Sequence, residues 1–103
     1  MDKTEAAKYF EKKGYDVNHE HPIKGNGAID ILATRGSRRV AVEVETGKSN
    51  IKANLEKIKD AGFDRVVFIV TSPTAVSACQ RAIEAVEYSS FDTTELLTWL
   101  DIS

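Results

Sequence analysis

The sequence has few of the residues that mark several common classes of protein. One cysteine among 103 residues excludes an intramolecular disulfide and a zinc cluster built on cysteines, and it fits a reducing compartment, so we expect a cytoplasmic protein. The formal net charge of -2 shows no overall excess of positive charge, which is the usual mark of a nucleic-acid-binding domain. No apolar run approaches the roughly 20 residues of a membrane-spanning helix, and the N-terminus lacks the apolar segment of a signal peptide, so we expect no membrane partner.

What the sequence does contain is typical of one globular domain. Hydrophobic residues make up 42% of it and charged residues 29%, and a chain of this length supports one hydrophobic core but not two. We therefore expect a single domain over residues 1–103. All but two of the 14 lysines and arginines lie within residues 1–61, so positive charge is concentrated in the N-terminal part.

Local patterns predict an alternation of helices and strands. A first helix ends at Gly14, and a strand follows it as far as Pro22. Later patterns predict a helix over 49–61, a strand covered on both faces over 64–72, a helix from Pro73 to about Val86 that buries Cys79, a short edge strand over 87–91 and a terminal helix over 92–100.

The stretch from Ile29 to Glu45 is the most informative, because two alternating runs flank the turn residues Gly36 and Ser37. A hairpin with this two-residue turn places six apolar residues on one face, which must belong to the core: Ile29, Ile31, Ala33, Val40, Val42 and Val44. The other face carries Asp30 and Leu32 opposite Ala41, Glu43 and Glu45. In this register Asp30 lies directly across from Glu43, with β-carbons about 4.5–5.5 Å apart.

These elements together predict the fold class. An antiparallel hairpin that leads into a β-α-β crossover gives a mixed sheet with helices on both sides. We therefore expect an α/β protein with the element order αβββαβα, followed by a C-terminal helix.

Three carboxylates on one sheet face require a physical explanation. Like charges opposite one another destabilise a sheet, whereas a hard divalent cation such as Mg²⁺ takes carboxylate oxygens as ligands and would turn the repulsion into attraction. Such an ion would also activate a bound water and stabilise charge on a phosphate oxygen. A solvated polar sheet face is the alternative, because glutamate is common on exposed strands.

The segment GNGAIDILATRGSRRVAVEVETG resembles the core of the PD-(D/E)XK nuclease superfamily, whose fold is called restriction-endonuclease-like. That motif has an aspartate at the start of one hairpin strand and Glu-x-Lys on the next; Asp30 and Glu43 match its two acidic positions. The segments YFEKKGYDV and GFDRVVFIVTSP are similar to the flanking elements of archaeal Holliday-junction resolvases and restriction-like domains. The resemblance covers about residues 3–75.

This resemblance implies a metal-dependent endonuclease that hydrolyses phosphodiester bonds in DNA, often as a homodimer. Mg²⁺ or Mn²⁺ would be bound by Asp30, Glu43 and the carbonyl of Val44. In the first helix, Glu5 matches the glutamate that often completes the metal site of this family. A chain of this length leaves no room for a separate recognition domain, so we expect structure-specific or non-specific cutting.

The chain departs from the family pattern at Glu45, which stands where the family usually has lysine. Some restriction enzymes also carry glutamate there, and Glu45 is expected to position the attacking water. Lys48 or Lys52 would then supply the missing positive charge. With Lys24 and Arg38, these residues are the predicted contacts to nucleic acid.

Two further interpretations stay open. The missing lysine favours a nuclease fold that has lost catalysis and retains DNA or protein binding, and a solvated sheet face favours a purely structural or interaction role.

On the first strand, His19 and His21 flank Glu20, and a zinc site there lacks a cysteine or a third histidine. Glu20 is a weak candidate for an additional acidic ligand.

Overall fold

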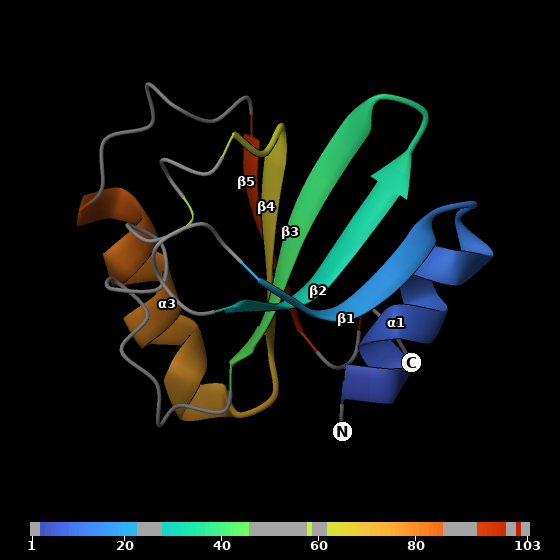
Figure 1. Ribbon diagram of the computed structural model, residues 1–103. Helices are drawn as coiled ribbons and strands as arrows, with labels where there is room; N and C mark the ends of the chain where they lie inside the picture. Colours follow the sequence, from blue (N-terminus) through green and yellow to red (C-terminus); the bar gives the residue numbers. More distant parts are fainter. Residues whose placement is uncertain are drawn as a thin grey trace.

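The chain folds into a five-stranded mixed sheet with helices against both faces (Figure 1). The computed structural model describes residues 3–22, 28–45, 58, 62–85, 93–98 and 101, with the backbone alone for 82–85 and 93–95. The elements are α1 (Lys3–Lys12), β1 (Asp16–Pro22), β2 (Ala28–Arg35), β3 (Arg38–Glu45), β4 (Arg65–Val70), α3 (Pro73–Ala85) and β5 (Thr93–Thr98). The predicted α/β class is confirmed.

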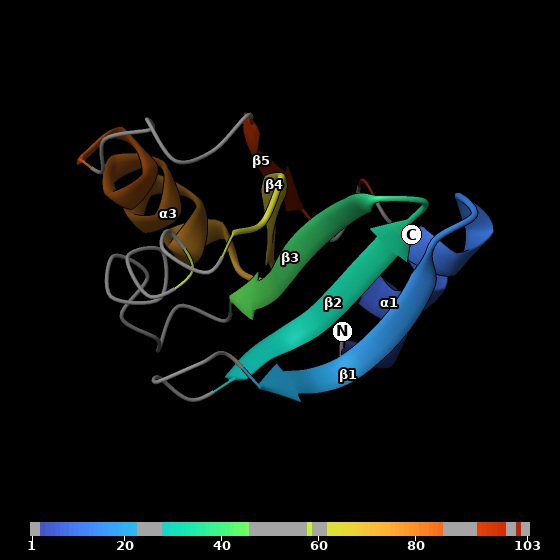
Figure 2. The same cartoon turned by 45° about the horizontal axis from the view of Figure 1, so that its top comes forward.

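The sheet has the order β1-β2-β3-β4-β5, antiparallel from β1 to β3 and parallel from β3 to β5. Helix α1 lies behind β1 and β2, while α3 packs on the opposite face at the other end of the sheet (Figure 2). Two core clusters result, one on the α1 side and one on the α3 side. The predicted arrangement of helices on both sides of a mixed sheet is thus confirmed.

Helix α1 ends in a Schellman motif built around Gly14. The Gly14 N–H donates to the Glu11 carbonyl at 3.0 Å, and the Tyr15 N–H donates to the Phe10 carbonyl at 3.1 Å. Gly14 has φ +90, a conformation that glycine adopts at little steric cost. The Tyr15 ring packs edge-on against Phe10 with 5.7 Å between centroids, which is the apolar contact typical of this motif. The predicted helix end at this glycine is confirmed.

The β2–β3 hairpin has the predicted register. Its strands pair from Arg35 opposite Arg38 to Ile31 opposite Val42, and φ +61 at Gly36 suits the first central residue of a type II′ turn. The α1-side cluster buries the expected apolar face of the hairpin against the helix, and its buried hairpin and helix residues are Ile31, Ala33, Val40, Val42, Ala6, Ala7 and Phe10.

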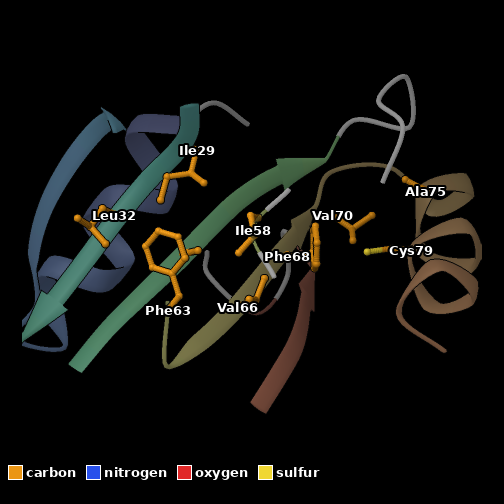
Figure 3. Packing of buried hydrophobic residues seen from close by; sticks show 10 residues of the cluster. Ile29, Leu32, Ile58, Phe63, Val66, Phe68, Val70, Ala75 and Cys79 are labelled. Carbon is orange, nitrogen blue, oxygen red and sulfur yellow. The ribbon is translucent and has the colours of Figure 1, made fainter. Parts of the chain in front are cut away.

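Ile29 departs from the predicted alternation. It was expected beside Ile31 on the α1 side, but it is buried in the α3-side cluster with Leu32 (Figure 3). The neighbouring strand is irregular at the same level: Glu20 has φ +51, and the pairing between β1 and β2 skips the Glu20–Asp30 position. The prediction for Ile29 was wrong because strict alternation requires a regular ladder, and here the ladder is interrupted.

Strand β4 is covered on both faces, as predicted from its continuous apolar sequence. Its residues divide between the two clusters, with Val66, Phe68 and Val70 on the α3 side and Val67 and Ile69 on the α1 side. Figure 3 shows the first set lying between the sheet and α3. Parallel neighbours on both edges satisfy the backbone of this strand.

Residues 93–98 form β5, where a terminal helix was predicted from Asp92 and Glu95 at capping-box spacing. That prediction was wrong, since β5 pairs in parallel with β4 along its whole length. Leu96 packs against the α3-side cluster and Leu97 against the α1-side cluster, so consecutive leucines serve opposite faces, as in a strand. Pairing with the open edge of β4 outweighs the local preference for a helix, because the backbone N–H and C=O groups at that edge require hydrogen-bond partners.

Three other predictions concern the segments between these strands. Helix α3 begins at Pro73, as predicted. The helix expected over 49–61 lies outside the described residues except for Ile58, which is helical and fully buried. The edge strand expected over 87–91 lies outside them entirely. In the described part of the chain, no helix has the length and apolar character needed to cross a membrane.

Phe68 offers a direct test of this core, because it is fully buried on the α3 side of β4. Phe68→Ala leaves a cavity that close-packed neighbours cannot refill, so we expect the free energy of unfolding to fall by about 3–5 kcal/mol. Urea denaturation measures it. The control Gln80→Ala, on the exposed face of α3, should change it by less than about 0.5 kcal/mol. Similar losses in both variants would contradict the core assignment.

Candidate functional site

Two of the predicted acidic residues, Asp30 and Glu43, lie where the β2–β3 hairpin opens. The described pairing between the strands ends at Ile31 opposite Val42, one step before Asp30 and Glu43. Beyond this point side chains take over as acceptors: Asp30 Oδ2 accepts the Val44 N–H at 2.8 Å, and Glu43 Oε1 accepts the Asp30 N–H at 3.4 Å. Each carboxylate thus accepts a backbone N–H from the opposite strand across the opening.

The bond to Val44 accounts for the end of the ladder. In a continued register, Ile29 and Val44 would form the next hydrogen-bonded pair. The Asp30 carboxylate takes the Val44 N–H instead, and Ile29 turns into the α3-side core. In a strand the N–H and C=O of one residue point to the same edge, so the Val44 carbonyl faces the same opening.

The two carboxylates differ in their access to solvent. The Asp30 side chain is 18% exposed, whereas Glu43 is 4% exposed and counts as buried. A buried carboxylate is costly unless hydrogen bonds or a positive charge compensate it. The opening of the hairpin is therefore a place where a cation is stabilising.

Helix α1 supplies such a cation. Lys3 Nζ lies 3.0 Å from Asp30 Oδ1 and 2.7 Å from Glu20 Oε1. Hydrogen bonds to Glu20 and then to Asp30 raise the pKa of Lys3 above its ordinary value, so Lys3 keeps its proton at neutral pH. No local sequence pattern indicates this role, because Lys3 is distant from both partners along the chain.

Glu20 joins the site through an unusual backbone conformation. Its φ of +51 lies in the left-handed region, which costs a residue with a side chain about 1–2 kcal/mol. Strain of this kind is found preferentially at functional sites. Glu20, Asp30 and Glu43 stand on β1, β2 and β3, and we call these three residues the carboxylate row. Within the described part of the chain, no three Asp, Glu, His or Cys side chains converge on one metal position.

Glu45 occupies a different environment. It is fully buried on the α3 side of β3, while its carbonyl accepts the Thr71 N–H at 2.9 Å. Burial, and then the nearby negative charge of Glu45, raise the pKa of the Cys79 thiol to about 12. Cys79 is therefore a protonated core thiol, which confirms its predicted role. Glu45 alternates with Val44, which packs against the α1-side cluster, so it lies on the same face of β3 as Ala41, beneath α3.

The other predicted site residues are more dispersed. Glu5 is exposed in the first turn of α1, two residues after Lys3 and hence at the helix end that reaches Asp30. Arg38 is exposed at the hairpin turn, at the opposite end of the hairpin from Asp30. The three predicted lysine contacts lie outside the described residues: Lys24, Lys48 and Lys52.

Comparisons with known proteins concern the fold alone. The sequence matches no protein-family model, and no curated protein matches it. The structure is similar to the crystal structure of AF1548, a protein of unknown function, with a TM-score of 0.58 and 16% sequence identity. The match covers 94% of this chain and 56% of that one, so this chain spans little more than half of the other protein.

Lys3→Met tests the ion pairs, because methionine keeps an apolar stem and removes the charge. The Lys3 and Glu20 side chains are 45% and 64% exposed, so we expect a loss of at most about 1 kcal/mol in unfolding free energy at neutral pH. Because folding raises the pKa of Lys3, the stabilisation from these ion pairs is complete below pH 10.5, the ordinary pKa of lysine. It declines as the pH rises above that value.

Urea titrations of both proteins between about pH 7 and about pH 11.5 measure this difference. The tyrosines, which also titrate at high pH, are the same in both proteins and largely cancel in the comparison. A difference that does not shrink at high pH would contradict the assigned ion pairs.

Proposed function

We propose that this protein is a metal-dependent endonuclease that hydrolyses phosphodiester bonds in DNA. One observation carries the proposal: Asp30 and Glu43 lie on the two strands at the open end of the hairpin, and each carboxylate accepts a backbone N–H from the opposite strand. Their positions are those of the two acidic residues in the PD-(D/E)XK motif that the sequence resembles. The AF1548 structure supports the fold but carries no information on activity.

The donor atoms at the opening fit Mg²⁺ or Mn²⁺. Magnesium takes oxygen ligands, commonly from one or two carboxylates, and keeps several waters. Asp30, Glu43 and the Val44 carbonyl offer oxygen only, and the partly exposed Asp30 gives access from solvent. When bound there, the ion would lower the pKa of a water and stabilise negative charge on a phosphate oxygen.

Lys3 supplies the fixed positive charge that the motif lacks at position 45. Its raised pKa keeps it protonated, so it serves as a cation for the substrate phosphate and not as a general base. The role of Glu45 in positioning the attacking water stays a prediction, and its burial beneath α3 favours Lys3 as the group at the opening. Glu5 stays a predicted additional ligand.

The nucleic-acid surface belongs to the same proposal. Lys24, Arg38, Lys48 and Lys52 would contact phosphates, with an affinity that falls as the salt concentration rises. A homodimer in the cytoplasm would present two such sites to the two DNA strands.

The second candidate function, a catalytically inactive DNA- or protein-binding module, is favoured by one observation, namely glutamate in place of lysine at position 45.

Asp30→Asn and Glu43→Gln test the proposal, because each removes one charge with little change in volume. We expect each to lower the metal-dependent cleavage rate at least about 100-fold, since a lost ligand removes several kcal/mol of transition-state stabilisation. The assay uses plasmid, linear and branched DNA with Mg²⁺, with Mn²⁺ and with EDTA.

Glu11→Gln is the matched control, because Glu11 is exposed on α1 and outside the carboxylate row. It should cleave at the wild-type rate. DNA binding without cleavage by the wild-type protein would support the inactive module instead. Neither binding nor cleavage, with no rise in melting temperature on adding metal, would contradict both functions.

Lys3→Met separates the roles of Lys3 and Glu45. We expect kcat to fall at least about tenfold, the loss of roughly 1.4 kcal/mol at the transition state. The affinity for Mn²⁺, measured by calorimetry, should rise because a competing ammonium has left Asp30. The outcome that contradicts this role is full activity in Lys3→Met combined with loss of activity in Glu45→Gln.

A further inference from the structure

A second feature lies at the other end of α1, where an open pocket forms between the helix and the far strands of the sheet. Its cavity volume is about 80 Å³, well below the range for enclosed small-molecule sites, and it is open to solvent. Its lining combines aromatic, cationic and aliphatic side chains from four parts of the chain: Tyr9, Phe10, Lys13, Tyr15, Arg65, Val67 and Leu97.

The aromatic wall of this pocket is fixed before any ligand arrives. The Schellman motif at Gly14 holds Tyr15 edge-on against Phe10, and Tyr9 meets Phe10 edge-on with 5.2 Å between centroids. Phe10 itself is buried in the core, whereas Tyr9 and Tyr15 are half-buried and present part of their rings. Little conformational entropy therefore remains to be lost when a planar ligand binds.

The charges of the pocket have one sign. Lys13 Nζ lies 5.0 Å from the centre of the Tyr9 ring, and Arg65 contributes a guanidinium at the start of β4. No aspartate or glutamate is among the described residues that line the pocket. Aromatic faces beside cations suit a ligand that joins a flat ring to an anion.

We propose that this pocket binds one unpaired nucleotide of a nucleic-acid strand, with its base against Tyr9 and Tyr15 and its phosphate at Lys13 and Arg65. Stacking on aromatic side chains with cations along the backbone is the general mode of single-strand binding. The choice of a nucleotide as ligand rests on the proposed nuclease function.

The distance between the two sites defines the substrate class. Lys3 and Lys13 are ten residues apart along α1 and its end, which corresponds to about 15 Å at 1.5 Å per residue. At about 3.4 Å per nucleotide along a duplex strand, this is about four nucleotides. The preferred substrate would therefore carry an unpaired base about four nucleotides from the bond that is cut, as in an overhang or a branched junction.

The test measures binding of a fluorescein-labelled ten-nucleotide thymidine strand by anisotropy, in EDTA so that cleavage plays no part. Tyr9→Leu and Lys13→Gln should each weaken binding about tenfold, since stacking contributes about 1–3 kcal/mol per base. Lys12→Gln is the matched control, because Lys12 is an exposed neighbour that does not line the pocket, and it should weaken binding at most about twofold.

Equal losses in Lys12→Gln and Lys13→Gln would overturn the proposal, because they would indicate a general basic surface. Absence of binding, or duplex binding of equal strength that ignores Tyr9, would overturn it as well. Lys13 is exposed, so Lys13→Gln decides the matter even if Tyr9→Leu fails to fold. If the expected losses of binding are found but no metal supports cleavage, the nuclease function is overturned and nucleotide binding in the pocket stands.

Discussion

The hydrogen bond from the Val44 N–H to the Asp30 carboxylate is the interaction on which the site depends. By taking a donor that a regular ladder would give to Ile29, Asp30 ends the pairing of β2 with β3. Ile29 then turns into the α3-side core, while Glu43 reaches the Asp30 N–H from the other strand. One side-chain acceptor thus creates the opening, places two carboxylates beside it and directs a backbone carbonyl toward it.

Helix α1 connects the opening of the hairpin with the pocket. Its first residue, Lys3, neutralises part of the carboxylate row, and the motif at its last turn sets the aromatic wall of the pocket. Between these ends its apolar face is buried against the hairpin. The strained Glu20 and the buried Glu43 are costs of this arrangement, and the packed sheet around β4 supplies the stability that offsets them.

Sequence patterns predicted those features that depend on local chemistry. Gly14 ended a helix, Gly36 and Ser37 fixed the hairpin register, and the apolar run of β4 required cover on both faces. The proximity of Asp30 and Glu43 followed from that register. Three features required tertiary information: the inversion of Ile29 depends on a side chain entering the ladder, β5 depends on the open edge of β4, and Lys3 reaches partners that are remote in the chain.

We propose that Asp30 and Glu43 form a divalent-cation site at the opening of the hairpin. The most direct measurement is a crystal structure of the protein soaked in Mn²⁺, with anomalous scattering used to locate the ion. We expect the strongest peak within coordination distance of Asp30 and Glu43, with Lys3 displaced from Asp30. A saturated crystal with no peak there, or with its main peak at His19 and His21, would contradict it.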